Sequence, residues 1–206
     1  MASTLIVTGG NGPDFLPSTI EYEYVIACDS GYDRAKKLNI KPDLVLGDMD
    51  STTMLDEVKA SGALFYPRDK DFSDTELAIK HLDSDDYILI GGGGGRIDHL
   101  LAIIALFYRY PAPKIWITEE DIVIRCDNSI TLNLPLKSDI SIFPISCDAK
   151  VTSEGLKWEL GGYTISNSNI SLSNRNEKET VRISSNKPVF IRLSIQLLSI
   201  FEKMIL

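Results

Sequence analysis

The first half of the chain alternates short runs of apolar residues with amphipathic stretches. The apolar runs have the length and the unbroken character of strands that are buried on both faces of a parallel sheet. They lie at residues 5–8, 24–28, 43–47, 63–66, 87–91 and 114–118. Between them, apolar residues recur at helical spacing at 30–39, 73–82 and 96–110. Because alternating strands and helices need crossover connections, this half predicts a layered α/β domain with a mostly parallel sheet.

The second half has a different pattern. From about Asp121 onward, apolar and polar residues alternate with a period of two, interrupted by Asn, Ser, Asp and Gly, and no convincing helix is found. This pattern is typical of an antiparallel all-β sandwich or barrel, and it includes the closing segment 189–198 among the strands. We place the boundary where EED follows KIWIT. The predicted domains are therefore α/β at 1–119 and a β-sandwich at 120–206.

Composition limits the partners that the chain can take. Its 206 residues are 44% hydrophobic and 24% charged, as in ordinary globular proteins, and the formal net charge is -8. Nucleic acid would meet a repulsive field, because binding to phosphates is driven by Lys and Arg, so no nucleic-acid partner is expected. A small cationic ligand would instead be attracted.

Cysteine usage and hydropathy indicate the compartment. Cys28, Cys126 and Cys147 are scattered without C-x-x-C spacing, which favours neither a zinc site nor a disulfide framework. No apolar run approaches the roughly 18 to 20 residues that cross a bilayer, and the N-terminus lacks a basic region ahead of its apolar residues. We therefore expect a first strand rather than a signal peptide, no membrane partner, and a reducing, cytoplasmic location.

Two carboxylates follow the apolar run at 43–47. In an extended segment, residues i and i+2 point the same way, so Asp48 and Asp50 are expected side by side. Two like charges at such a short distance repel one another unless a cation lies between them. Hard oxygen ligands favour Mg²⁺, so a divalent metal site is one interpretation. The other is a solvated turn in which these acids cap the next helix.

A second acidic stretch follows the expected strand at 63–66. Ser73 and Glu76 have the S-x-x-E spacing of a capping box, which accounts for both and makes Asp74 an ordinary acid of a first helical turn. The capping box does not account for Asp71. Acidic loops at the carboxyl ends of parallel strands open on the same edge of a sheet, where such sheets bind ligands. Together the two loops would supply the carboxylates that a phosphate-bound Mg²⁺ needs.

Five glycines, Gly91–Gly95, separate an expected strand from an expected helix. Without side chains, backbone N–H groups can approach a phosphate chain at a helix N-terminus, although no Walker A motif is present. Arg96 would supply positive charge with bidentate geometry. The alternative is a flexible turn. Asp98 and His99 follow in the first helical turn, and His99 fits packing or capping better than general-base chemistry.

These segments resemble a known family. The blocks at 27–51, 66–79, 91–102 and 153–169 are similar, in the same order, to four signature blocks of the thiamine pyrophosphokinase family. The resemblance covers nearly the whole chain, and the combination is specific where no single block is. It implies an α/β domain followed by a β-sandwich, and a homodimer with active sites near the subunit interface. It also implies transfer of pyrophosphate from ATP to the hydroxyethyl group of thiamine, releasing AMP.

The resemblance also implies roles for individual residues, carried over by matching position. The implied metal ligands are Asp48, Asp50, Asp71 and Asp74, with Asp69 an alternative in the second block. The implied ATP-binding residues are Asp29, Ser51, Gly92, Gly93, Gly94, Gly95 and Arg96. The implied thiamine-binding residues are Asp98, Trp158, Ser166 and Asn167, and the implied catalytic residues are Asp71, Asp98 and Arg96. One departure is visible, since the family's A-D-G-G reads ACDSG here, with Cys28 inserted and Ser30 replacing a glycine.

Two alternatives from other classes remain. LVLGDMDST also fits the D-x-D-x-T nucleophile motif of haloacid-dehalogenase-like phosphatases, although that motif usually follows a first strand and would leave the glycines without a purpose. A non-catalytic nucleotide-sensing module would bind ATP and Mg²⁺ through the same loops. Pyrophosphoryl transfer needs mainly positioning and charge neutralisation, and a loose transition state makes strong base catalysis by Asp71 or Asp98 unnecessary.

Overall fold

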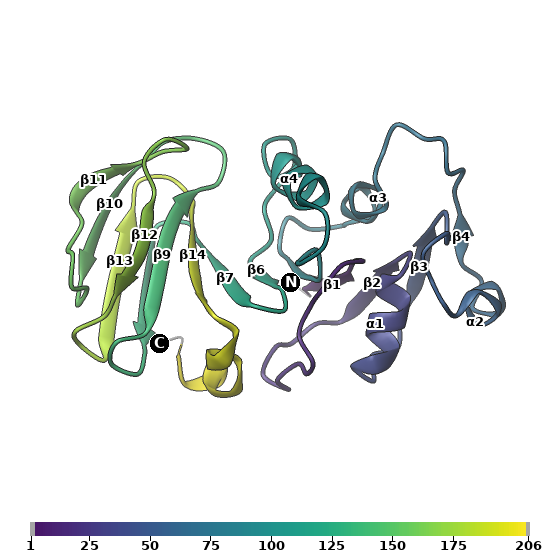
Figure 1. Cartoon of the computed structure of the whole chain (residues 1–206), viewed down its shortest axis with the longest axis horizontal. Helices are drawn as coiled ribbons and strands as arrows, with labels where there is room; N and C mark the ends of the chain where they lie inside the picture. Colours follow the sequence, from purple (N-terminus) through teal and green to yellow (C-terminus); the bar gives the residue numbers. More distant parts are fainter. Residues whose placement is uncertain (1–2, 205–206) are drawn as a thin grey trace. The chain divides into compact units, whose positions relative to one another are not determined.

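The computed structural model describes residues 3–204 and divides the chain into two compact units, Met1–Glu120 and Asp121–Leu206 (Figure 1). Each unit is described by itself. Within the described residues, no helix is both long enough and apolar enough to cross a membrane.

The first unit contains a parallel sheet in the order β6-β5-β1-β2-β3-β4. Its strands are β1 Thr4–Val7, β2 Tyr24–Cys28, β3 Leu44–Gly47, β4 Leu64–Phe65, β5 Tyr87–Ile90 and β6 Ile115–Ile117. Strands β1, β5 and β6 are buried along their whole length, as continuous apolar runs require. The chain runs outward from β1 through β2, β3 and β4, and then returns to the other side of β1 with β5. This reversal is a topological switch point, where the carboxyl ends of the strands form a crevice.

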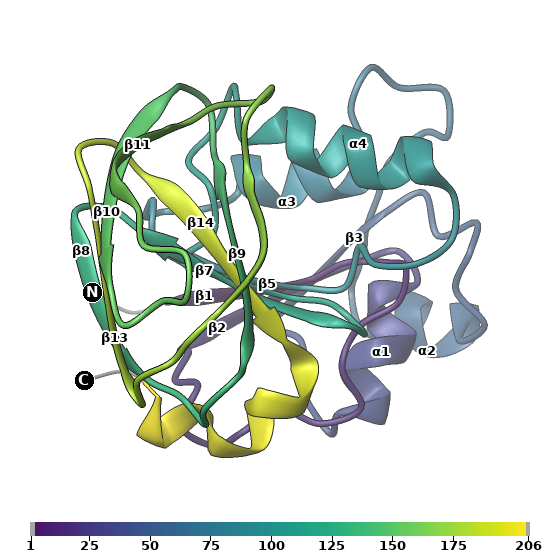
Figure 2. The same cartoon turned by 60° about the vertical axis from the view of Figure 1, so that its left-hand side comes forward.

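Four helices cover the sheet, with α3 and α4 on one face and α1 and α2 on the other (Figures 1 and 2). They are α1 Gly31–Lys37, α2 Leu55–Ala60, α3 Asp74–Lys80 and α4 Ile97–Leu106. The helix α3 begins as its sequence predicts, because the Ser73 side chain accepts a hydrogen bond from the Glu76 N–H at 3.1 Å. The helix α2 was not predicted. It has six residues and buries Val58 alone, so it carries no helical periodicity.

The second unit contains two antiparallel sheets, ordered β12-β9-β14-β7 and β11-β10-β13-β8. Its strands are β7 Asp121–Cys126, β8 Ser129–Asn133, β9 Asp139–Pro144, β10 Ala149–Glu154, β11 Gly161–Ile165, β12 Ser171–Arg175, β13 Thr180–Ser185 and β14 Val189–Ser194. Alternation places every second residue of β13 in the core, including Val181 and Ile183.

The α/β fold class with a β-rich second part is confirmed, but one element was predicted wrongly. The closing segment was included among the strands, whereas β14 ends at Ser194 and a 3₁₀ helix, η1 Ile195–Lys203, follows. The Ser194 side chain accepts a hydrogen bond from the Gln196 N–H and begins this helix. The apolar residues Leu198 and Phe201 are buried at a spacing of three, which a period-two pattern cannot satisfy.

Candidate active site

A pocket of about 460 Å³ opens at the carboxyl ends of β1, β2, β3 and β5. Each strand leads directly into a loop that lines it: Thr8, Gly9 and Gly10 after β1, Asp29 after β2, Asp48 after β3 and Gly92 after β5. Its position at the switch point of the sheet is the one that open α/β folds use for ligands. Its volume is within the range of small-molecule sites.

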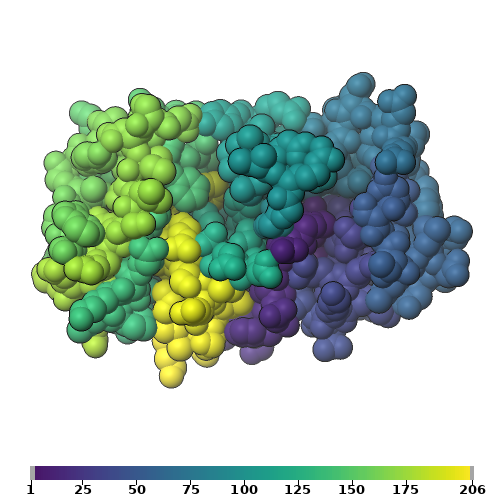
Figure 3. Space-filling model, in the orientation of Figure 1, coloured from purple at the N-terminus to yellow at the C-terminus, as the bar shows by residue number. Residues whose placement is uncertain are grey.

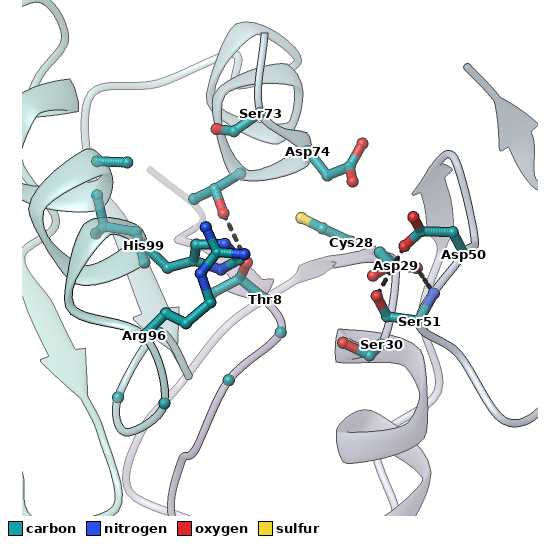
Figure 4. Close-up of a pocket in the computed structure, with 18 of the residues that line it drawn as sticks. Thr8, Cys28, Asp29, Ser30, Asp50, Ser51, Ser73, Asp74, Arg96 and His99 are labelled. Atoms are coloured by element: carbon teal, nitrogen blue, oxygen red, sulfur yellow. Dashed lines mark hydrogen bonds between the residues drawn. The ribbon is translucent and has the colours of Figure 1, made fainter. Parts of the chain in front are cut away.

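Three carboxylates meet on one side of the pocket, and Figure 4 shows two of them, those of Asp29 and Asp50. Asp29, Asp48 and Asp50 each offer an oxygen within 4.8 Å of the others. The loop does not continue β3 in extended form, as the sequence had suggested, because Met49 takes a left-handed φ of 59°. The two acids converge instead through a turn in which the Asp50 N–H donates to Asp48 Oδ1 at 3.3 Å. Asp29 joins them with a φ of 48° and accepts from the Ser51 N–H at 3.2 Å.

The donor set at this cluster fits a hard cation. All three donors are carboxylate oxygens, which Mg²⁺ prefers. The Cys28 thiol lies among the lining residues, but burial, followed by the charges of Asp74 and Asp29, raises its pKa well above the usual range. A protonated thiol is a poor metal ligand, so the cluster presents oxygen alone. Although Cys28 and Ser30 depart from the family's A-D-G-G pattern, Asp29 still lines the pocket.

One lysine lies among these acids. Lys70 Nζ is 3.1 Å from Asp48 Oδ2 and 3.2 Å from Asp74 Oδ1. Burial, then the charges of Asp48 and Asp29, raise the pKa of Asp74, and they outweigh the opposing effect of Lys70. On the outer side, Arg68 Nε is 3.1 Å from Asp50 Oδ2, and the Arg68 side chain is 83% exposed.

The glycine segment forms a second wall of the pocket. Gly91 has a φ of 99°, and a Cβ there would lie 2.4 Å from the Thr8 carbonyl oxygen, so a side chain is excluded. The N–H groups of Gly92 and Gly93 donate to the carbonyls of Gly9 and Asn11 at 2.7 and 2.9 Å. Gly92 and Gly93 therefore line the pocket, but their N–H groups form hydrogen bonds to the neighbouring loop. Both N–H groups are already hydrogen-bonded within the protein, although the sequence analysis had expected them at ATP.

Arg96 and His99 lie across the pocket from Asp29, Asp50 and Ser51 (Figure 4). Arg96 forms a bidentate ion pair with Asp98, at 3.1 Å from Nε to Oδ1 and 2.5 Å from the second nitrogen to Oδ2. These hydrogen bonds hold the pKa of Asp98 below its usual range. Both side chains are exposed, so the pair can open toward an incoming anion.

Not every residue implied by the resemblance lies at the pocket. Asp74 lines it, whereas Asp69 and Asp71 are exposed and are not among the lining residues. Asp98 is held by Arg96 and does not line it either. The structure adds Thr8, Gly9, Gly10, Lys70 and Thr75, which the sequence analysis did not single out. The signal for the first loop was the pair of glycines that directly follows the first apolar run.

In the second unit, Trp158 presents its ring to solvent with the residue 54% exposed. The buried Asn174 fixes its backbone, donating to the Trp158 carbonyl at 2.7 Å and accepting from its N–H at 3.2 Å. Lys157 Nζ lies 4.5 Å from the ring centroid. Ser166 pairs with Asn169 across the turn that contains Asn167. The indole is thus held outward by the backbone rather than packed into the core.

Comparison with known proteins decides the family. Residues 18–118 match the model for "Thiamin pyrophosphokinase, catalytic domain", and residues 122–190 match that for "Thiamin pyrophosphokinase, vitamin B1 binding domain". The chain belongs to the thiamin pyrophosphokinase family. The resemblance in the sequence motifs is thereby confirmed, and the matches give no support to the phosphatase or the sensing-module interpretation.

Relatives of this thiamin pyrophosphokinase family member include plant enzymes. "Thiamine pyrophosphokinase 1" of Oryza sativa subsp. japonica is 28% identical over 183 residues, covering 78% of this chain and 69% of the rice protein. "Thiamine pyrophosphokinase 2" of Arabidopsis thaliana is 25% identical and covers 93% of this chain and 86% of that protein.

Solved structures of the same family share the fold. A thiamin pyrophosphokinase family protein from Enterococcus faecalis superposes with a TM-score of 0.74 at 22% identity, over 94% of this chain and 99% of that one. Thiamine pyrophosphokinase from Bacillus subtilis gives a TM-score of 0.72 at 24% identity, over 93% and 98%.

Proposed function

We propose that this protein transfers pyrophosphate from ATP to the hydroxyl group of thiamine, forming thiamine pyrophosphate and AMP. The observation that carries the proposal is the meeting of the carboxylates of Asp29, Asp48 and Asp50 with the glycine segment and Arg96 around one pocket. The matches to a catalytic domain and a vitamin B1 binding domain of one family support ATP and thiamine as the substrates. The hydroxyl oxygen of thiamine forms a bond to the β-phosphorus of ATP as the bond between that phosphorus and the bridging oxygen breaks. AMP leaves with this oxygen, and the hydroxyl proton is released to water.

The metal in this proposal is Mg²⁺. Asp29, Asp48 and Asp50 would hold it, with Asp74 nearby, and it would supply charge neutralisation for the phosphate oxygens. The exposed Asp71 is the weaker candidate for a ligand. The donor set supports this assignment because it consists of oxygen atoms alone.

The chain's own residues then position the phosphates. Arg96 can exchange its exposed partner Asp98 for phosphate oxygens, which accept the same bidentate pattern. Gly94 and Gly95 present backbone without side chains beside it. Such contacts act mainly by positioning and by stabilising charge, so that no strong base is required of Asp98 or Asp71.

For thiamine, we propose that Trp158 takes the neutral pyrimidine ring. The indole is outward-facing, and Lys157 and Arg175 already lie 4.5 and 5.9 Å from the ring centroid, which disfavours a further cation such as the thiazolium. Ser166, Asn167 and Asp98 complete the proposed set of thiamine contacts. The thiazolium would be drawn to the acidic side of the site.

We further propose a homodimer. The helix α4, in teal, lies at the surface of the first unit (Figure 3). It exposes apolar side chains on one face, with Ile97 at 74%, Leu101 at 57% and Tyr108 beyond its end at 48% exposure. A stripe of this kind is usually covered by another surface, because contiguous exposed apolar area marks interaction sites.

The central test is AMP formation from ATP, Mg²⁺ and thiamine. We expect AMP in amounts equal to thiamine pyrophosphate, and no AMP when thiamine is left out. Asp48→Asn should lower the rate by at least about 100-fold with an unchanged circular dichroism spectrum. Asp56→Asn, the same change on the exposed first turn of α2, is the control and should keep full rate. A near-normal rate for Asp48→Asn removes Asp48 from the metal site, and a trapped aspartyl-phosphate would favour a phosphatase.

A further inference from the structure

Lys70 is a largely buried cation inside the acidic side of the pocket. Its side chain is 12% exposed, and its ammonium lies 3.1 Å from Asp48 Oδ2 and 3.2 Å from Asp74 Oδ1. A buried ammonium needs carboxylate partners, and these two acids meet that need. An ammonium has three donors, and Lys70 also lines the pocket that the glycine segment closes.

The contacts of Lys70 put it in competition with a metal ion. Asp48 belongs to the carboxylate cluster, yet its Oδ2 is taken by Lys70 and its Oδ1 accepts the Asp50 N–H. A cation that binds the cluster through Oδ2 must displace the ammonium or share that oxygen with it, and one that binds through the second lone pair of Oδ1 still places a positive charge beside Lys70. Since two cations repel one another, displacement is favoured.

The charge around the pocket favours such an exchange. Four carboxylates, those of Asp29, Asp48, Asp50 and Asp74, line the pocket together with Lys70, and two of them, Asp48 and Asp74, contact its ammonium. Among residues 3–204, the other cation paired with these acids is Arg68, which is largely outside, with its side chain 83% exposed. A divalent ion that arrives with a phosphate chain adds both the positive charge that the acids lack and new acceptors for the ammonium.

We propose that Lys70 binds the phosphate chain of the nucleotide and stands in for the metal before the nucleotide arrives. In the free protein, its ammonium holds Asp48 and Asp74 together. When the metal and the nucleotide enter, Asp48 binds the metal instead of Lys70. The flexible Lys70 side chain then changes conformation, and its ammonium binds phosphate oxygens beyond the α-phosphate. This inference rests on the proposed function, since it assigns a further phosphate-binding residue to that site.

The test measures binding rather than turnover, with thiamine left out. Lys70→Met keeps most of the length of the side chain and removes its charge. Titration calorimetry would give the affinities for Mg²⁺·ATP and for AMP, and electron paramagnetic resonance would give that for Mn²⁺ alone. We expect Lys70→Met to bind Mn²⁺ about tenfold more tightly and Mg²⁺·ATP about tenfold more weakly, with AMP unchanged. A general loss of structure would instead weaken all three.

Arg68→Met is the matched control. It removes a cation from the same loop and the same cluster, but one whose pair with Asp50 is exposed and contributes little. Each of its three affinities should change by less than about threefold. Should Lys70→Met fail to fold, Lys70→Gln makes the same test with a polar, uncharged side chain.

The outcomes test the exchange with the metal and the contact with the distal phosphates separately. Mn²⁺ affinity that stays equal or falls in a folded Lys70 variant overturns the exchange with the metal. Unchanged Mg²⁺·ATP affinity, or an equal loss for AMP, overturns the contact with the distal phosphates. If the expected shifts are found but the wild-type protein makes no AMP from ATP and thiamine, the role of Lys70 stands and the proposed reaction is wrong.

Discussion

Glu76 shows how one side chain can serve structure while its neighbours serve the site. The residue is 3% exposed, and its carboxylate accepts hydrogen bonds from Arg109 at 3.0 and 2.9 Å and from the Tyr110 hydroxyl at 2.9 Å. The predicted capping box is therefore only half formed, because Ser73 caps α3 while the Glu76 side chain turns to Arg109. A buried carboxylate gains more from a bidentate guanidinium than from a single backbone N–H.

Glu76 should make the stability of the fold depend on pH. Burial acts to raise its pKa, but the hydrogen bonds from Arg109 and Tyr110 and the nearby charges hold the pKa below its ordinary value of 4.5. A depressed pKa stabilises the fold above about pH 4.5, and this contribution is lost as the pH falls through the folded-state pKa. Glu76→Gln should lower the free energy of unfolding by about 1 kcal/mol or more at pH 7.

The measurement is urea unfolding of the wild type and Glu76→Gln between pH 7 and pH 3. The difference between the two proteins should be constant down to about pH 5 and should shrink below about pH 4.5. A difference that stays constant to pH 3 would show that the charge of Glu76 does not stabilise the fold.

At the residue scale, the sequence predicted the acids but not their surroundings. Asp48 and Asp50 were identified from their place after an apolar run. Their closeness was expected from an extended backbone, whereas it depends on the left-handed Met49, which no periodicity indicates. Lys70 was missed because its place at the pocket depends on Asp48, which lies 22 residues away, whereas its contact with Asp74, four residues on, gives no sign of the pocket in the sequence.

Among the elements, the glycine segment has the most restrictive geometry. Four of its five residues have positive φ, with Gly93 the exception. The sequence showed that residues 91–95 have no side chains, but it did not show which contacts or backbone angles require glycine at each position. Gly91 lacks one because Thr8 of the β1 loop lies against it, whereas Gly95 faces open space. The same residue type therefore meets two different requirements within one loop.

Alanine should cost different amounts at these two glycines. Gly91→Ala combines a φ of 99° with a Cβ at 2.4 Å from the Thr8 oxygen, so it should lower the free energy of unfolding by about 2 kcal/mol or more. Gly95→Ala has a φ of 68° and meets nothing within 4 Å, so its cost should be about 1 kcal/mol. Denaturant unfolding measures both. Equal costs would show that the contact with Thr8 gives way.

Element prediction succeeded where the pattern was long. The strands of the parallel sheet and the helices α1, α3 and α4 lie where apolar periodicity placed them, with ends shifted by a few residues. The six-residue α2 and the 3₁₀ helix η1 were missed. Elements this short carry too few periodic positions, and tertiary packing decides their conformation.

On the scale of the whole molecule, the exposed stripe on α4 leads to a prediction about assembly. If a second copy covers this face, Leu101→Glu should weaken the dimer by about tenfold or more, because an apolar contact is lost and a charge is buried. Sedimentation velocity over a range of concentrations measures it. Leu136→Glu is the control, since Leu136 is 55% exposed against 57% for Leu101 but lies in the turn between β8 and β9.

The control should leave the dimer unchanged, and both variants should keep the melting temperature of the individual units. A wild-type protein that sediments as a monomer at all concentrations contradicts the homodimer, and an undisturbed Leu101→Glu dimer moves the interface away from α4.

The left-handed Met49 has a consequence for how the acidic loop behaves without a ligand. The residue is 4% exposed and packs in a hydrophobic cluster with Ala27, Tyr32, Val45 and Val58, and in the chain it joins Asp48 to Asp50. Hydrophobic packing of Met49 thus holds the loop in place against the repulsion between Asp48 and Asp50, and this packing needs no bound ion. Chelation should leave the backbone of this loop in place, so that metal and nucleotide can exchange in each cycle without refolding the site.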